Sequence, residues 1–218
     1  MLIKQIVVGS FRVNCYLVAC PKTKNCVIID PGGDADLILQ SVREDGLHPL
    51  FILNTHGHAD HVVANRQLSA AFSIPVCMHE DDDIFFADPA VRLVSEKELG
   101  LVPPGPADIR LKDGEVLEVG SLRIRVIHTP GHTPGSVCYL VAGNLFTGDT
   151  LFVGDVGRTD LSGGSFDKLL ASIKDKILPL PDTTKVLPGH DYGEAPTSTL
   201  AWEKEENPYI TDFILAAE

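Results

Sequence analysis

Hydrophobic positions along the chain form short alternating or continuous runs, separated by turn residues and by stretches with helical spacing. In the first half the pattern predicts strands at residues 2–8, 16–19, 27–29, 51–54 and 74–78. Asp34 is expected to cap a helix that ends before Gly46, and residues 60–72 also show helical spacing. The order strand, helix, strand, helix, strand is typical of a partly parallel sheet covered by helices.

The second half repeats this organisation. Strands are expected at residues 122–127, 137–141, 145–146 and 185–187, and helices at the start of 81–108 and at 166–177 and 198–206. Lys112-Asp113-Gly114 predicts a hairpin turn, and so does Gly143-Asn144. Pro103-Pro104-Gly105-Pro106 predicts an irregular surface connection. Because each half ends its strands in polar loops, we expect two αβ layers packed sheet against sheet, with a site at one edge.

Composition narrows the class of protein. The chain has 218 residues, 44% of them hydrophobic, which is enough for a well-buried core. Its net charge of −12 argues against a nucleic-acid partner, because phosphate binding requires a basic face. No apolar stretch approaches the roughly twenty residues of a membrane helix, and the N-terminus predicts a strand pair rather than an export signal. We therefore expect a cytoplasmic protein without a membrane partner.

Cysteine usage agrees with that expectation. The five cysteines are scattered and show no C-x-x-C spacing, which favours buried, reduced thiols over a disulfide framework or a catalytic thiol. They are Cys15, Cys20, Cys26, Cys77 and Cys138.

The strongest chemical signal follows the strand at 51–54. His56, His58, Asp60 and His61 lie within six positions, and Gly57 allows the backbone to turn sharply between them. Imidazole and carboxylate suit zinc and similar divalent ions. Isolated histidines are usually solvated or packed, but this density of ligands predicts a metal site.

Three later segments supply further ligands of the same type. His132, Asp149 and His190 each follow a predicted strand, beside Gly or Pro. Each residue alone also fits an ordinary turn. Together with the first loop they indicate a single constellation. The remaining histidines lack this setting and are expected to be structural; they are His48, His79 and His128.

These motifs resemble the metallo-β-lactamase superfamily. The HxHxDH loop, the later His, Asp and His, and DPGG at 30–33 carry the resemblance over nearly the whole chain. Within the superfamily, VNCYLV at 13–18 and GDTLFVGDVGRTDLSGG at 148–164 are most similar to short glyoxalase II-like hydrolases, which act as hydroxyacylglutathione hydrolases. The resemblance implies an α/β fold, a four-layer αββα sandwich, formed as a single domain over residues 1–218.

The resemblance also implies a ligand set for two divalent metal ions. Zinc is the expected metal, although such ligands accept iron or manganese. One ion would be held by His56, His58 and His132, and the second by Asp60, His61 and His190. Asp149 would bridge the two ions, and Asp60 and Asp149 would be the catalytic carboxylates. Asp30 would orient a ligand from outside, although a turn carboxylate before Pro31 explains it equally well.

The activity implied is hydrolysis of a thioester by a metal-bridging hydroxide, with a small glutathione thioester as the expected substrate and another acyl thioester or an ester as the open alternative. A thiolate, whose parent thiol has a pKa of about 8.5, leaves without strong acid assistance. The chain has no G-x-S-x-G nucleophile motif. Arg158 and Tyr192 are the candidate substrate contacts, against an Arg158–Asp160 structural pair and simple packing of Tyr192. Full-length glyoxalase II enzymes carry a C-terminal helical extension with basic glutathione contacts, which this sequence is expected to lack.

Two alternatives remain open. Persulfide dioxygenases share the HxHxDH loop, a GRTD segment like 157–160 and a His-Asp-Tyr like 190–192, and they bind one iron. In such an enzyme His56, His132 and Asp149 would form the two-histidine, one-carboxylate set. A purely structural zinc site is usually closed and often rich in cysteine, whereas the cysteines here lie away from the cluster. A nuclease of the same superfamily is disfavoured by the acidic charge. The sequence favours the hydrolase.

Overall fold

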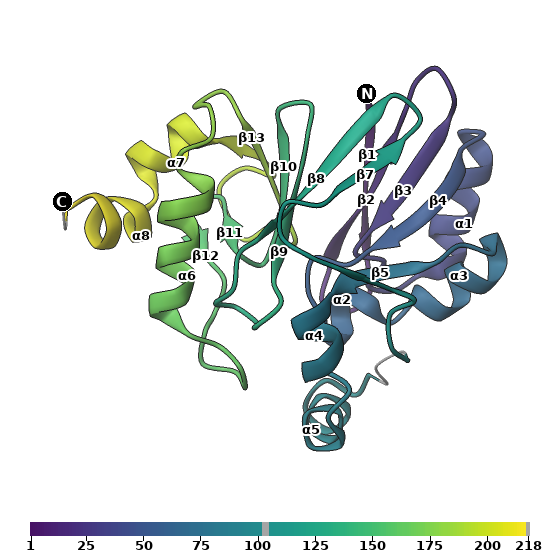
Figure 1. Cartoon of the computed structure of the whole chain (residues 1–218), viewed down its shortest axis with the longest axis horizontal. Coiled ribbons are helices and arrows are strands. Elements are labelled where there is room, and N and C mark those ends of the chain that lie inside the picture. The colour runs from purple at the N-terminus through teal and green to yellow at the C-terminus, as the bar shows by residue number, and fades with distance from the viewer. Residues whose placement is uncertain (102–104, 217–218) are drawn as a thin grey trace.

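Two six-stranded sheets lie face to face, and helices flank both outer sides (Figure 1). The computed structural model describes residues 1–101 and 105–216. The first sheet runs in sequence order, with β1 to β3 antiparallel and β3 to β6 parallel. Its strands are β1 (Leu2–Val8), β2 (Val13–Ala19), β3 (Asn25–Ile29), β4 (His48–Leu53), β5 (Val76–His79) and β6 (Ile109–Leu111).

The second sheet has the strand order β14-β13-β10-β9-β8-β7, and only β10 and β13 pair in parallel. Its strands are β7 (Val116–Val119), β8 (Leu122–His128), β9 (Val137–Val141), β10 (Asn144–Gly148), β13 (Lys185–Pro188) and β14 (Ser198–Thr199). A small antiparallel ribbon of β11 (Leu151–Phe152) and β12 (Asp155–Val156) forms a separate two-stranded sheet, and Leu151 and Val156 pack in the cluster outside the second sheet.

Helices cover the outer face of each sheet and one edge of the sandwich (Figure 1). Those of the first half are α1 (Ala35–Glu44), α2 (Ala59–Val62), α3 (Asn65–Phe72), α4 (Glu80–Phe85) and α5 (Pro89–Leu99). Those of the second half are α6 (Phe166–Ser172), which continues into the π-helical turn η1 (Ile173–Ile177), then α7 (Leu200–Glu206), α8 (Pro208–Ile210) and η2 (Thr211–Leu215). No helix in the described part of the chain combines the length and apolar character that a membrane span requires.

Three buried clusters show that the layers follow the predicted order. The cluster between the sheets joins Tyr16 and Leu53 of the first sheet to Tyr139 of the second. Outside the first sheet, Ile38 and Val42 lie one helical turn apart on α1 and pack against the sheet. Outside the second sheet the cluster comes from β8, β9, β10 and β13 together with α6, η1, α7, α8 and η2. The four-layer αββα sandwich is therefore confirmed, and the five cysteines are all buried and free.

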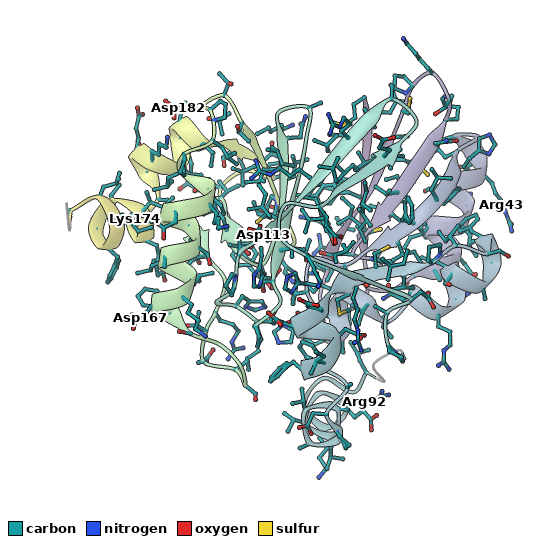
Figure 2. The ribbon with its side chains drawn as sticks, in the orientation of Figure 1. Arg43, Arg92, Asp113, Asp167, Lys174 and Asp182 are labelled. Carbon is teal, nitrogen blue, oxygen red and sulfur yellow. The ribbon has the colours of Figure 1, made fainter. Side chains whose placement is uncertain are left out.

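Several predicted details are wrong. Lys112-Asp113-Gly114 is not a hairpin turn, because β6 before it belongs to the first sheet and β7 after it to the second. Figure 2 shows Asp113 between the two halves, where its carboxylate accepts hydrogen bonds from the backbone N–H of His128 (2.9 Å) and from Lys176 Nζ (2.8 Å). The chain crosses from one sheet to the other here. Gly120 and Ser121 form the turn between β7 and β8 instead.

Other local predictions need smaller corrections. The helix expected at 60–72 is divided into α2 and α3. Asp34 occupies the N-cap position of α1 but makes no capping hydrogen bond; its Oδ2 accepts from the backbone N–H of Gly9 at 2.8 Å. The turn between β9 and β10 is Ala142-Gly143, both with positive φ, and Asn144 is already in β10. Residues 103 and 104 of the predicted Pro-rich connection lie outside the described residues.

Candidate metal centre

Four strand ends deliver the predicted ligands to one edge of the sandwich. β4 leads into the first loop (Thr55–His61), β8 into the second loop (Thr129–Gly135), β10 into Asp149, and β13 into His190. Since β4 belongs to the first sheet and the other three strands to the second, each half of the fold contributes part of the site.

The first ligand set consists of His56, His58 and His132. One ring nitrogen from each lies within 4.8 Å of the others. His58 Nδ1 and His132 Nε2 are only 2.9 Å apart, and the rings of His56 and His132 are nearly perpendicular at a centroid distance of 4.7 Å. The first two histidines come from the first loop and the third from the second loop, so this set joins the two halves.

The second ligand set consists of Asp60, His61 and His190, whose ligand atoms also lie within 4.8 Å of one another. His61 Nε2 and His190 Nε2 are 3.1 Å apart, and Asp60 Oδ2 lies 3.6 Å from His190 Nε2.

Asp149 lies between the two sets. Its Oδ1 is 3.4 Å from His61 Nε2, and its Oδ2 is 3.6 Å from both His132 Nε2 and His190 Nε2. One carboxylate thus contacts both sets, and the structure brings all seven predicted ligands together.

The nitrogens on the far side of three rings are held by hydrogen bonds. His132 Nδ1 donates to the carbonyl of Arg158 (2.7 Å), and His190 Nδ1 donates to the carbonyl of Phe11 (3.1 Å). His61 Nδ1 donates to Asp30 Oδ2 at 3.1 Å. These bonds keep a proton on Nδ1 of each ring, so in the neutral form of each ring the lone pair is on Nε2, which faces the other ligands. Such outer hydrogen bonds fix the orientation of metal-binding histidines.

Asp30 supports both ligand sets. Asp30 is buried. In addition to the bond from His61 Nδ1, it accepts hydrogen bonds from the backbone N–H of Thr55 (2.7 Å) and from Thr55 Oγ1 (2.5 Å). With its proton directed to Asp30, the Thr55 hydroxyl can accept from His56 Nδ1 at 3.1 Å. Asp30 therefore contacts His61 directly and reaches His56 through Thr55.

Burial controls the pKa values of four histidines, which we call the neutral histidines. Burial lowers the pKa of His132 and of His190 to about 4 in each case, and it holds the pKa values of His56 and His58 well below the usual range. These rings remain neutral near pH 7, which is the form that binds a cation.

His61 and Asp149 behave differently. Burial alone would lower the pKa of His61, but the carboxylates of Asp149, Asp60 and Asp30 raise it to about 10. Burial raises the pKa of Asp149 to about 7, against the opposing effect of His61.

A bound cation would satisfy the polar atoms that lack a hydrogen-bond partner in the protein. Among the described residues, the buried side-chain nitrogen and oxygen atoms without a hydrogen-bond partner are His56 Nε2 and Asp149 Oδ1. Both belong to predicted ligands, and buried polar atoms of native proteins are otherwise almost always paired. The imidazole and carboxylate donors also match the preferences of zinc, iron and manganese. The residues present fit a metal centre.

The predicted substrate contacts lie at the rim of this centre. Tyr192 is 64% exposed and its ring stacks on His190 at a centroid distance of 4.9 Å. The Arg158 guanidinium makes two hydrogen bonds to Asp160, at 2.7 and 2.8 Å, so the structural pair considered above is present. Both partners of this pair are largely exposed.

A further group of potential ligands lies away from the centre: His79, Asp81 and His128. The two rings stack almost parallel, 3.9 Å apart, so their in-plane lone pairs do not converge. His79 Nδ1 accepts from the backbone N–H of Asp81 at 3.3 Å, and His128 Nε2 donates to the carbonyl of Pro134 at 2.9 Å. These bonds give both histidines a local structural role and tie the second loop to the start of α4.

Two residues next to the ligands are absent from the sequence predictions. Asp82 on α4 is buried and contacts both metal loops, and burial raises its pKa to about 6 against three hydrogen-bond donors that lower it. Phe86 packs edge-on against the His58 ring at a centroid distance of 5.4 Å. In the sequence Asp82 belongs to the acidic run at 80–83, which is typical of an exposed helix start. The one sequence signal for a buried acid is the length of this run, because four consecutive acidic residues are more than a helix N-terminus requires.

Comparison with known proteins gives the same class as the fold and the site. The sequence profile of the metallo-β-lactamase superfamily matches residues 8–190. The probable metallo-hydrolase YqgX of Bacillus subtilis is 37% identical over 97% of this chain and 99% of its own. The hydroxyacylglutathione hydrolase GloC of Haemophilus influenzae is 34% identical over 96% and 98%. The chain belongs to the metallo-β-lactamase superfamily and is a metal hydrolase of that superfamily.

Solved structures agree. The BLEG-1 B3 metallo-β-lactamase has a TM-score of 0.87 and 41% identity, covering 96% of this chain and 100% of its own. TTHA1623, in a di-iron-bound form, has a TM-score of 0.82 and 36% identity, covering 94% and 99%. ETHE1 from Myxococcus xanthus has a TM-score of 0.82 and 31% identity, covering 96% and 84%.

Proposed function

We propose that the protein is a binuclear metal hydrolase that cleaves thioesters, with a glutathione thioester as its substrate. The observation that carries the proposal is the contact of Asp149 with both ligand sets. Its Oδ1 lies near His61, and its Oδ2 lies near His132 and His190. A mononuclear centre would need only one of the two ligand sets. The di-iron-bound TTHA1623 supports a two-ion reading, with the metal left open between zinc, iron and manganese.

When bound by these residues, two divalent ions would supply a nucleophile from water at neutral pH and a Lewis acid for the carbonyl oxygen. The chain's own residues position the reacting groups. Asp60 and Asp149 have side chains that are 14% and 11% exposed, so their carboxylates border the open side of the site, where they can orient water and accept its proton. Asp30 keeps His61 in the tautomer that presents Nε2 to the centre.

A thioester suits this arrangement because its thiolate leaves without a strong general acid. The Arg158 guanidinium, at the rim, can exchange Asp160 for a substrate carboxylate, and planar Arg–carboxylate pairing provides two hydrogen bonds. The exposed ring of Tyr192 offers a flat surface beside His190 for the rest of the thiol portion. The similarity to GloC, which is named a hydroxyacylglutathione hydrolase, supports glutathione as that portion.

The test is a steady-state assay with S-lactoylglutathione on protein prepared metal-free and then reloaded with Zn²⁺, Mn²⁺ or Fe²⁺. We expect turnover only after reloading, maximal at two equivalents of metal. Asp149→Asn is expected to lose at least about 100-fold in kcat, because both ligand sets lose a shared carboxylate. Absence of metal-dependent thioester turnover with every metal would refute the proposal.

The second candidate is persulfide oxidation at one iron held by His56, His132 and Asp149. The structure brings these three side chains together, and the ETHE1 neighbour is compatible with this alternative. Oxygen uptake on glutathione persulfide by protein with one equivalent of Fe²⁺, without thioester turnover, would select it. Nitrocefin is tested beside S-lactoylglutathione and glutathione persulfide because the structural neighbour BLEG-1 is a lactamase. Cleavage of nitrocefin and of neither other substrate would exclude both candidate functions.

A further inference from the structure

Helix α4 lies against both loops that form the first ligand set, and it carries a buried carboxylate. Asp82 has no exposed surface. An ionised side chain is costly to bury unless hydrogen bonds replace its water, so the partners of Asp82 indicate why it is tolerated.

Those partners belong to the two metal loops. Asp82 Oδ2 accepts hydrogen bonds from the backbone N–H of Gly57 (2.8 Å) and from Thr133 Oγ1 (2.7 Å). Asp82 Oδ1 accepts from the backbone N–H of Gly135 at 2.6 Å. Gly57 separates His56 from His58 in the first loop, and Thr133 follows His132 in the second loop. One carboxylate thus connects the backbones of both loops.

The packing around these hydrogen bonds leaves little room for movement. A Cβ on Gly135 would lie 2.8 Å from Asp82 Oδ1 and Cβ, and a Cβ on Gly57 would lie 2.7 Å from Phe86 Cε2. Real Cβ atoms do not approach other atoms so closely, so both positions need glycine. Because α4 is this close to both loops, a shift of Asp82 moves the loops relative to each other.

We propose that Asp82 is a positioning residue for the first metal site. It holds the first and second loops at the separation that brings His58 Nδ1 to 2.9 Å from His132 Nε2, and it thereby sets the metal affinity of that site. The inference rests on metal binding by the proposed ligands and is independent of the substrate.

The next residue on α4, Asp83, is a matched control that separates the proposed positioning role of Asp82 from a purely structural role of a buried acid. Asp83 is also buried, and it accepts hydrogen bonds from the backbone N–H of Ala107 (2.7 Å) and from Arg110 Nε (2.8 Å). Its partners lie before and in β6, away from the metal loops. Asp83→Asn therefore removes a buried charge from the same helix without touching the site.

The experiment compares Asp82→Asn with Asp83→Asn in the full chain, by Co²⁺ titration against a chromophoric chelator and by the visible spectrum of bound Co²⁺. In Asp82→Asn, the side-chain NH2 group replaces one carboxylate oxygen and faces the backbone N–H of Gly57 or of Gly135. Because both groups are donors, that hydrogen bond is lost. We expect the affinity of the first site to fall by up to the roughly 10- to 100-fold that loss of a direct outer partner of a metal ligand causes, because the backbones of both loops carry the displacement to His58 and His132, and we expect a changed Co²⁺ spectrum. Asp83→Asn is expected to keep the wild-type affinity and spectrum, whatever its thermal stability.

Wild-type affinity and spectrum in folded Asp82→Asn would overturn the proposal, as would an equal loss in Asp83→Asn. If Asp82→Asn does not fold, Thr133→Val and Thr133→Ser replace it: the valine removes one donor to Asp82 and the serine retains it. Weaker Co²⁺ binding in the valine variant and recovery in the serine variant are expected; wild-type binding by Thr133→Val would overturn the inference. A wild-type protein that binds no Co²⁺ would overturn both this inference and the metal centre, whereas failure of thioester turnover alone leaves the inference standing.

Discussion

Asp30→Asn isolates the control of a single imidazole tautomer. Asn has the size of Asp and tolerates the left-handed backbone at this position, where φ is 48°. Its amide oxygen can still accept from the Thr55 backbone N–H. Its amide nitrogen then replaces Oδ2 and faces Thr55 Oγ1 and His61 Nδ1. The hydroxyl can rotate to accept, but the ring N–H of His61 cannot.

The conflict has a defined outcome. The neutral, metal-binding form of His61 must carry its proton on Nε2 to accept from the new amide, and Nε2 is the atom that lies 3.1 Å from His190 Nε2 inside the site. The ring can then bind a metal only by breaking the new hydrogen bond. Loss of an outer partner of this kind lowers metal affinity about 10- to 100-fold, or about 1.4–2.7 kcal/mol. The loss should fall mainly on the Asp60–His61–His190 set, which Asp30 contacts directly, because in the first set the Thr55 hydroxyl can still accept from His56 Nδ1.

Chelator-competition titration with Zn²⁺, combined with a metal count after equilibrium dialysis, measures both affinities. We expect Asp30→Asn to retain one tight equivalent and to bind the second about 10- to 100-fold more weakly. Asp36→Asn, an exposed carboxylate that accepts from Gln67, is the control and should bind both ions normally. Two equivalents bound to Asp30→Asn at wild-type affinity would refute the tautomer argument.

Three further outcomes are expected. In the metal-free protein His132 and His190 have pKa values of about 4, below that of an unfolded histidine, so their stabilising effect is present above pH 6.5 and is lost as pH falls from 6.5 toward 4, by up to about 1.4 kcal/mol per pH unit for each ring. His56 and His58 act in the same direction, whereas the raised pKa of Asp149 offsets part of the loss. Urea unfolding with chelator at pH 7, 6 and 5 checks the net decrease in stability, and a flat profile would contradict it. Gly189→Ala should reduce the metal content after dialysis, because its Cβ would lie 2.5 Å from Asp149 Oδ1 and 2.9 Å from His61 Cε1; a full complement of metal would show that the site can expand. Arg158→Ala should raise KM for a thioester carrying a carboxylate about tenfold or more with little change in kcat, since a bidentate pair is lost; an unchanged KM would contradict a role of this side chain in substrate binding.

The fold was largely predictable because burial imposes a periodicity on each strand and helix. The residues 2–8 alternate and form β1, and the apolar run that precedes the first loop forms β4. The failures concern long-range pairing. Lys112-Asp113-Gly114 has the composition of a hairpin turn, yet β6 pairs with β5 and β7 pairs with β8. A local motif does not record which sheet the next strand joins.

The candidate site was predictable where its chemistry is concentrated. Three histidines and an aspartate in the first loop are improbable without a metal, and the later ligands follow the same strand-end pattern. Asp30 was ambiguous because its role depends on Thr55 and His61, which lie 25 and 31 positions further along the chain. Asp82 was missed because helix starts are commonly acidic and the sequence does not show which acid points inward.

The division of the centre between the two sheets gives bound metal a diagnostic value. Each of the two predicted ligand sets is complete only when both halves are in place: His56 and His58 require His132, while Asp60 and His61 require His190. A chain whose halves have docked incorrectly therefore lacks one ligand of each set and is expected to hold metal less tightly. The amount of tightly bound metal per chain then measures the fraction of molecules whose two halves have assembled in the native way. A chelator is expected to weaken the contact between the two halves as well as to abolish catalysis.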